Sequence, residues 1–319
     1  MKAMLKTFLR VTAGGLAMAL LLGQQQPAAA QDAPGKTLTL PEPTGTPPAT
    51  CTPVQGAAIP TRDVVLQQSF LDNFKTLDKA ALGRPYQTAT TWMAHFAGDP
   101  SQVNFRTLPA NNEQEIYVDP SYAGTTPAPL RLDPFTLTPD GLVITATRTP
   151  AQLKAALSNF PFYSGMLQSK KLFSQTYGYF EAKAKMPTGK AMWPAFWMLN
   201  VNGAWPPEID IFEMFDGTKP DKQTMTVHFK TGGYGPHQAT YCNISVPGAE
   251  TAFHLYGVLW NMERITFYVD RSPVATFATP PGLNTPMYML LDLAVENHID
   301  ATTPDTAQFG VGWVTAYKY

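Results

Sequence analysis

Charged residues are scarce in this sequence, and neither sign of charge dominates. Of its 319 residues, 23 are Lys or Arg and 24 are Asp or Glu, so the formal net charge is −1. Binding to nucleic acid or to an anionic membrane depends on a basic surface. The balance of charge therefore gives no basis for either partner, whereas a hydrophobic content of 44% allows a large core.

Cysteine and histidine are also few. Cys51 and Cys242 are the two cysteines, and the sequence leaves open whether they form a disulfide or remain two free thiols. The five histidines show no pair at i, i+4 with a third ligand, which is the usual spacing of a zinc site. We therefore predict no catalytic metal.

Long apolar runs are absent except at the N-terminus. There, Lys2, Lys6 and Arg10 flank the 13-residue run VTAGGLAMALLLG, which is too short to favour a membrane span, and small residues follow at 28–30. Residues 1–30 are predicted to be a secretory signal peptide, with an uncleaved anchor as the alternative. The mature protein is then expected to be secreted or periplasmic, with no membrane association after cleavage.

The rest of the chain divides by composition. Residues 31–62 are rich in Pro, Thr, Gly and Ala, which predicts a linker or extended tail that buries little. Residues 63–319 form one predicted domain of many short strands separated by Gly, Pro and Asn, with convincing helix only at 150–160. Ten or more strands in one domain predict an all-β fold, an antiparallel jelly-roll sandwich.

One predicted strand carries an unusual set of acids. In EIDIFE, Glu208, Asp210 and Glu213 are spaced i, i+2, i+5. Strict alternation would bury Glu213 in the core at a large cost in free energy. A β-bulge after Asp210 would return Glu213 to the acidic face and leave Phe212 directed inward.

Such a cluster has a chemical use. A retaining glycosidase needs two carboxyl groups about 5–5.5 Å apart, one as nucleophile and one as acid/base. Clustered carboxylates also shift one another's pKa values, so that one can be protonated while another is ionised. The alternative is a solvated acidic face on a surface strand. That alternative explains less well why apolar and aromatic residues flank the acids on both sides.

The same residues resemble the catalytic motif of glycoside hydrolase family 16 in its β-bulge form, as in laminarinases and related endo-β-glucanases. Residues 164–199, 111–119, 253–270 and 286–295 are similar to other segments of that family in the same order. The resemblance implies a concanavalin-like jelly roll with an open concave cleft. It implies that Glu208 is the nucleophile, that Glu213 is the acid/base, and that Asp210 tunes the nucleophile's protonation.

The resemblance also implies residues that bind substrate. Tryptophans in the segment of Trp193 and Trp197 line the sugar subsites in the family, and both would share one face of a strand; packing in the core is the alternative. Trp205 could cap the cleft or pack a loop. Asn112 is expected to bond a sugar hydroxyl, unless it is a turn residue. His228 is expected in the cleft near Glu213, or packed elsewhere.

A secreted, endo-acting, retaining glycosidase is therefore expected, with a β-1,3- or β-1,3-1,4-glucan or a glucose-containing bacterial exopolysaccharide as substrate. A transglycosylase using the same acids and a non-catalytic carbohydrate-binding protein are the alternatives. We expect a monomer that requires no cofactor. A structural calcium ion is common in the family, but Gly312 stands where many members have an acidic ligand, which argues against calcium here.

Overall fold

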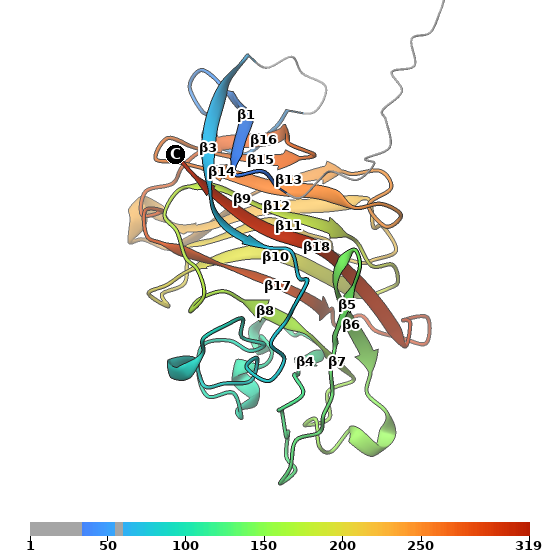
Figure 1. The fold of residues 1–319 in the computed structure, drawn as a ribbon. Helices are drawn as coiled ribbons and strands as arrows, with labels where there is room; N and C mark the ends of the chain where they lie inside the picture. Colours follow the sequence, from blue (N-terminus) through green and yellow to red (C-terminus); the bar gives the residue numbers. More distant parts are fainter. Residues whose placement is uncertain (1–33, 55–59) are drawn as a thin grey trace, which may run out of the picture.

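The described chain forms two packed β-sheets (Figure 1) in a computed structural model that describes residues 34–54 and 60–319. The larger sheet follows the order β2-β16-β15-β14-β9-β18-β6-β7-β4, to which β1, β3 and β5 are added. The smaller sheet follows the order β13-β12-β11-β10-β17-β8. In the described residues, only the β4–β7 pair is parallel. The predicted antiparallel sandwich is confirmed.

The smaller sheet consists of β8 (Met166–Gln168), β10 (Met192–Asn200), β11 (Glu208–Glu213), β12 (Lys222–Lys230), β13 (His237–Ser245) and β17 (Met287–Val295). The larger sheet consists of β1 (Thr37–Pro43), β2 (Thr52–Pro53), β3 (Thr61–Asp72), β4 (Glu115–Tyr117), β5 (Phe135–Thr138), β6 (Gly141–Arg148), β7 (Phe162–Ser164), β9 (Gly178–Lys185), β14 (His254–Trp260), β15 (Arg264–Val269), β16 (Ser272–Ala278) and β18 (Thr306–Lys318). The short 3-10 helices are η1 (Tyr86–Thr88), η2 (Val103–Phe105), η3 (Pro109–Asn111), η4 (Ala151–Leu153) and η5 (Thr231–Gly233). No helix of the described residues is long and apolar enough to cross a membrane.

The core between the sheets follows from alternation along each strand. In β9, Phe180 and Ala182 are fully buried in this core. Tyr179 and Glu181 point to the opposite face and yet are also fully buried. A further layer must therefore cover the outer face of the larger sheet.

The covering layer comes from residues 34–54, which we call the N-terminal strap. Its strand β1 pairs with β3, and Leu38 and Leu40 pack in a second cluster that includes Tyr179 and Tyr268. The expectation that residues 31–62 bury little is wrong for this part, because alternation in TLTLPEP gives the strand an apolar face. The predicted signal peptide lies outside the described residues, and the domain start at residue 63 stays a prediction.

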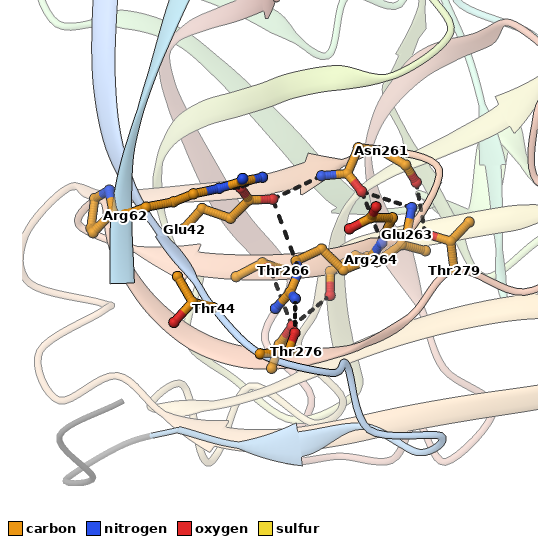
Figure 2. A network of polar contacts seen from close by, with 12 residues as sticks. Glu42, Thr44, Arg62, Asn261, Glu263, Arg264, Thr266, Thr276 and Thr279 are labelled. Atoms are coloured by element: carbon orange, nitrogen blue, oxygen red, sulfur yellow. Dashed lines mark hydrogen bonds and ion pairs between the residues drawn. The ribbon is translucent and has the colours of Figure 1, made fainter. Parts of the chain in front are cut away.

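A buried carboxylate fixes the strap to the sheet (Figure 2). Glu42 is 1% exposed, and its Oε2 atom accepts a hydrogen bond from the Arg62 Nε at 2.9 Å. Its Oε1 atom accepts one from the Asn261 Nδ2 at 2.8 Å, and the Arg264 Nε lies 4.0 Å away. Since a buried carboxylate is costly unless paired, these donors from β3, β15 and the turn before it specify where β1 docks.

The predicted helix at 150–160 is wrong. Only Ala151–Leu153 is helical, as a single 3-10 turn, and turns follow. Ser158 and Asn159 have φ angles of 53° and 66°, which a right-handed helix cannot contain. The apolar periodicity is real, because Leu153 and Leu157 pack in a small separate cluster, but a compact turn satisfies it.

The strap is also joined covalently to the smaller sheet. Cys51 and Cys242 form a disulfide that connects residues 191 apart in sequence, and Cys242 lies on the edge strand β13. The sequence left open whether these two cysteines pair, and in the structure they do. A crosslink across so long a loop restricts the unfolded chain strongly.

We predict that replacing both cysteines by alanine destabilises the protein by about 2–5 kcal/mol, because the unfolded chain regains its freedom. Thermal unfolding followed by circular dichroism measures this loss. Reduction of the wild-type protein should reproduce the drop in midpoint and should not affect the double variant. Equal midpoints for the oxidised wild type and the double variant would contradict the prediction.

Candidate active site

The predicted β-bulge is present in β11. Asp210 pairs with Thr226 of β12, and Glu213 pairs with Thr224, so three steps along β11 match two along β12. The register with β10 shifts at the same place. The extra residue lets both Ile211 and Phe212 point into the core, where each is fully buried.

The three acids consequently share the face of the smaller sheet that is turned away from the core. Glu208, Asp210 and Glu213 all line a cleft of about 950 Å³. The cleft crosses the sheet from Tyr241 on β13 to Tyr288 on β17, and loops around residues 96–113 and 199–205 form its walls. The strand of acids thus forms part of the floor of a groove large enough for a chain-like ligand.

Glu208 is held by a tryptophan at the start of the strand. The Trp205 Nε1 donates a hydrogen bond to the Glu208 Oε2. The Trp205 ring is 51% exposed and lies 4.6 Å from the His237 ring, between centroids. Trp205 therefore caps the cleft, which was one of its two predicted positions.

His228 lies in the cleft, but beside Asp210 and not beside Glu213. It pairs with Glu208 across β12 and β11, and its Nε2 atom is 3.3 Å from the Asp210 Oδ2. Its other ring nitrogen, Nδ1, is 2.9 Å from the His237 Nε2. The expected neighbour was wrong because the bulge lies between Asp210 and Glu213 and displaces Glu213 from this row.

Glu213 contacts a second tryptophan. The Trp193 Nε1 donates to the Glu213 Oε1 at 3.2 Å, and the Thr226 hydroxyl donates to Oε2 at 3.5 Å. The Trp193 ring lies 5.0 Å from the Phe215 ring in the cleft lining. Trp193 is thus both an aromatic surface of the cleft and a hydrogen-bond donor to the acid.

Trp197 contacts a fourth carboxyl group, that of Asp292, which was not predicted from the sequence. Trp197 lines the cleft, and its Nε1 atom donates to the Asp292 Oδ1 at 2.5 Å. The Tyr117 hydroxyl donates to the Asp292 Oδ2 at 3.3 Å. Asp292 aligns with Ala195, which aligns with Glu213 in the next strand. The sequence signal that could have identified Asp292 was its position as the single acid within the apolar segment MYMLLDLAV.

Comparison with known proteins identifies the family to which this chain belongs. A profile described as glycosyl hydrolases family 16 matches residues 135–314. The chain belongs to this family. It is 37% identical over 260 residues to "Endo-1,3-1,4-beta-glycanase ExsH" of Rhizobium meliloti (strain 1021), which is 80% of this chain and 52% of that protein. "Endo-1,3-1,4-beta-glycanase EglC" of the same organism is 36% identical over 257 residues, with the same two coverages. The chain thus spans about half the length of these relatives.

Solved structures share the fold of this family member. The laminarinase catalytic domain from Thermotoga maritima MSB8 superposes with a TM-score of 0.61 at 22% identity, covering 80% of this chain and 98% of that one. SCLam, a non-specific endo-β-1,3(4)-glucanase of family 16, superposes with a TM-score of 0.62 at 23% identity, covering 86% of this chain and 97% of that one. At these identities the likeness shows the jelly-roll fold.

Burial and mutual repulsion raise the pKa values of the acids in the cleft. Burial, and next the charge of Asp210, raise the pKa of Glu208 well above its ordinary range. Burial, and next the charge of Glu213, do the same for the pKa of Asp210. Burial and the charge of Glu208 raise the pKa of Glu213 to about 8, although hydrogen bonds from Trp193 and Thr226 oppose the shift.

The carboxyl groups of this cluster therefore do not all ionise at neutral pH. Carboxyl oxygens of Glu208 and Asp210 lie within 4.8 Å of each other, and two buried carboxyl groups this close do not both ionise readily. Burial raises the pKa of Asp292 to about 8 as well. At neutral pH the cleft can thus hold a protonated Glu213 beside a Glu208–Asp210 pair with one proton.

Asn112 does not line the cleft, so its predicted position is wrong. Its backbone is left-handed with φ at 58°, and its carbonyl accepts a hydrogen bond from the Gln114 side chain. Asn111 lines the cleft instead, and its side chain donates to the Glu113 Oε1 at 3.1 Å. In this doubled pair, the turn at the end of η3 decides which asparagine faces the groove.

The structure offers little support for calcium at Gly312. That residue has no side-chain oxygen, and the aliphatic stem of Lys183 occupies the space that a side chain there would enter. A lysine is a poor neighbour for a cation. Within the described residues, the carboxylates of Glu208 and Asp210 and the imidazole of His228 lie within 4.8 Å of one another. The absence of a metal and of a required cofactor stays a prediction.

We predict that Glu213→Gln stabilises the protein increasingly as pH rises from about 4.5 to 8. The folded pKa of Glu213 is raised from 4.5 to about 8, so in this window the unfolded chain loses the proton that the folded chain keeps, and unfolding is favoured. The neutral amide removes this penalty. Unfolding midpoints measured across pH give the difference between variant and wild type.

The exposed Asp63 provides the control for this experiment. Asp63→Asn should follow the wild-type curve across the same pH range. A Glu213→Gln difference that stays constant from pH 4 to pH 9 would contradict the raised pKa.

Proposed function

We propose that this chain is a secreted or periplasmic endo-acting glycoside hydrolase that retains the anomeric configuration and cleaves internal β-glucosidic bonds. The observation that carries the proposal is the bulged strand, because it presents Glu208, Asp210 and Glu213 together in an open cleft. Family membership supports the reaction class. The Cys51–Cys242 disulfide supports an oxidising compartment.

In the first step, the Glu208 carboxylate attacks the anomeric carbon while Glu213 protonates the leaving glycosidic oxygen. The glycosidic bond breaks and a covalent glycosyl-enzyme forms. The raised pKa of Glu213 suits this role, because a general acid must hold its proton near neutral pH. Asp210 lies beside Glu208, and Glu208 attacks as a carboxylate when the proton of this pair is on Asp210.

In the second step, Glu213 now acts as a base. It removes a proton from water, the water oxygen attacks the anomeric carbon, and Glu208 is released as a carboxylate. Two displacements at the same carbon restore the original configuration. The donors to each acid, Trp205 at Glu208 and Trp193 at Glu213, hold the two groups at their separate places along β11.

The shape of the cleft supports action within a polymer. The groove crosses the smaller sheet from β13 to beyond β17, and strands lie about 4.8 Å apart, so it extends for roughly 20 Å. Trp193, Trp197 and Trp205 provide aromatic faces along it, on which the apolar faces of sugars can stack. A substrate that passes through such a groove is cut between subsites and not at its end.

The substrate proposed is a β-1,3- or β-1,3-1,4-linked glucan or a glucose-containing exopolysaccharide. Its support is the names of the two Rhizobium meliloti relatives, each an endo-1,3-1,4-β-glycanase. Fold alone does not decide among these polymers, since family members reshape the loops around a common floor. We propose that the protein acts as a monomer on the polysaccharide and needs no cofactor.

We predict that Glu208→Gln and Glu213→Gln each lower kcat on β-glucan by about 10²–10⁴-fold or more. The two variants should differ in how much activity they regain on a substrate with a good leaving group. An aryl glycoside leaves without protonation, so it should restore much of the first-step rate of Glu213→Gln but not of Glu208→Gln. Nuclear magnetic resonance of the first product should show the β-anomer.

Lys171→Gln, at an exposed position, is the control for this experiment and should keep wild-type activity on both substrates. Near-normal hydrolysis by Glu208→Gln of every glucan that the wild type cuts would exclude the mechanism. Accumulation of oligosaccharides longer than the substrate would instead identify a transglycosylase, and binding without turnover in the wild type would identify a carbohydrate-binding protein.

A further inference from the structure

One lysine stands out in a cleft whose other ionisable groups are acids, tyrosines and a histidine. Lys170 follows β8 and lines the groove, and among the described lining residues it is the single Lys or Arg. Its neighbour Lys171 is exposed and does not line the groove, and its ammonium lies 4.8 Å from the centre of the Tyr86 ring. Both ammonium groups reach Tyr86, but only that of Lys170 reaches Tyr288 and the groove, so Lys171 is a control for the groove position.

Lys170 has no carboxylate partner within the described part of the chain. Its ammonium lies over two aromatic rings, 5.2 Å from the centre of Tyr86 and 5.3 Å from that of Tyr288. Burial, and next the charge of Lys171, lower the pKa of Lys170. A half-buried ammonium without a counter-ion is costly, and a bound anion would relieve that cost.

The position of Lys170 is fixed relative to the bond that would be cleaved. Glu208 aligns with Leu199 of β10, and Leu199 aligns with Tyr288 of β17. Two strand spacings therefore separate Glu208 from Tyr288, about 10 Å, and Lys170 lies beyond Tyr288 on the side of β8. This distance corresponds to a sugar more than one unit away from the reacting one.

We propose that Lys170, with Tyr288, forms a subsite for a carboxylate carried by the polysaccharide, on a sugar remote from the cleaved bond. The ammonium supplies up to three donors to the carboxylate, and the Tyr288 ring, which also lines the groove, contacts the face of the sugar that bears it. This inference rests on the proposed polysaccharide substrate and narrows it to acidic polymers. The carboxylate belongs either to a uronic acid in the chain or to an acidic substituent on a neutral sugar.

The remote position explains how an acidic polymer fits an acidic catalytic centre. Glu208, Asp210 and Glu213 lie on β11, two strands away from Tyr288, and Asp292 lies further along β17 from Tyr288. A negative charge at Lys170 is therefore separated from the reacting acids, and screening by water and salt weakens their repulsion further.

Binding tests the subsite without turnover. In the Glu208→Gln background, calorimetry compares three forms of one soluble β-glucan: unmodified, partly oxidised to glucuronate, and partly carboxymethylated. We expect tighter binding of at least one carboxylated form at low salt, and about tenfold weaker binding of it after Lys170→Gln. Lys170→Arg and Lys171→Gln should keep the preference, and about 0.5 M salt should remove most of it. The carboxylated polymer that binds more tightly identifies which source of carboxylate the subsite accepts.

Equal affinity for all three polymers in the Lys170-containing protein would overturn the proposal. So would a loss of preference in Lys171→Gln as large as that in Lys170→Gln, because a general basic patch would then be responsible. Hydrolysis of the same polymers by the wild type is measured separately. A wild type that binds the carboxylated form through Lys170 but cuts none of them would refute the proposed hydrolase and leave the subsite standing.

Discussion

The β-bulge in β11 turns Ile211 and Phe212 toward the core together, and the positions of the three acids depend on that turn. Without the extra residue, alternation would place Glu213 between the sheets beside Phe196 and the other core side chains. The cost of burying an unpaired carboxylate makes that register unfavourable. The same apolar residues that stabilise the sandwich therefore hold the acids in the cleft.

Desolvation then gives these acids their properties. The cleft floor is covered by tryptophan rings and by the neighbouring strands, so Asp210 and Asp292 are 2% and 4% exposed. In such surroundings, adjacent carboxyl groups do not all ionise, and protons remain in the site at neutral pH. Trp193, Trp197 and Trp205 each donate one indole hydrogen bond to a carboxyl group, so the residues that line the groove also position its acids.

The smaller sheet is supported from two sides. The larger sheet packs on its inner face, and the N-terminal strap covers the outer face of the larger sheet and is joined to β13 through Cys51 and Cys242. β13 is an edge strand, and Tyr241 beside the disulfide lines the cleft. Glu42 directs the docking of the strap, so a segment that reads as a tail contributes to the frame of the site.

The sequence alone determined the sandwich, the strands, the bulge and the three acids, because alternation and the cost of a buried charge are local properties. Only the tertiary structure decided which of Asn111 and Asn112 faces the groove, that His228 neighbours Asp210, and that Asp292 joins the cleft. These depend on register between strands far apart in sequence. The burial of the strap likewise depended on a surface that exists only once the larger sheet has formed.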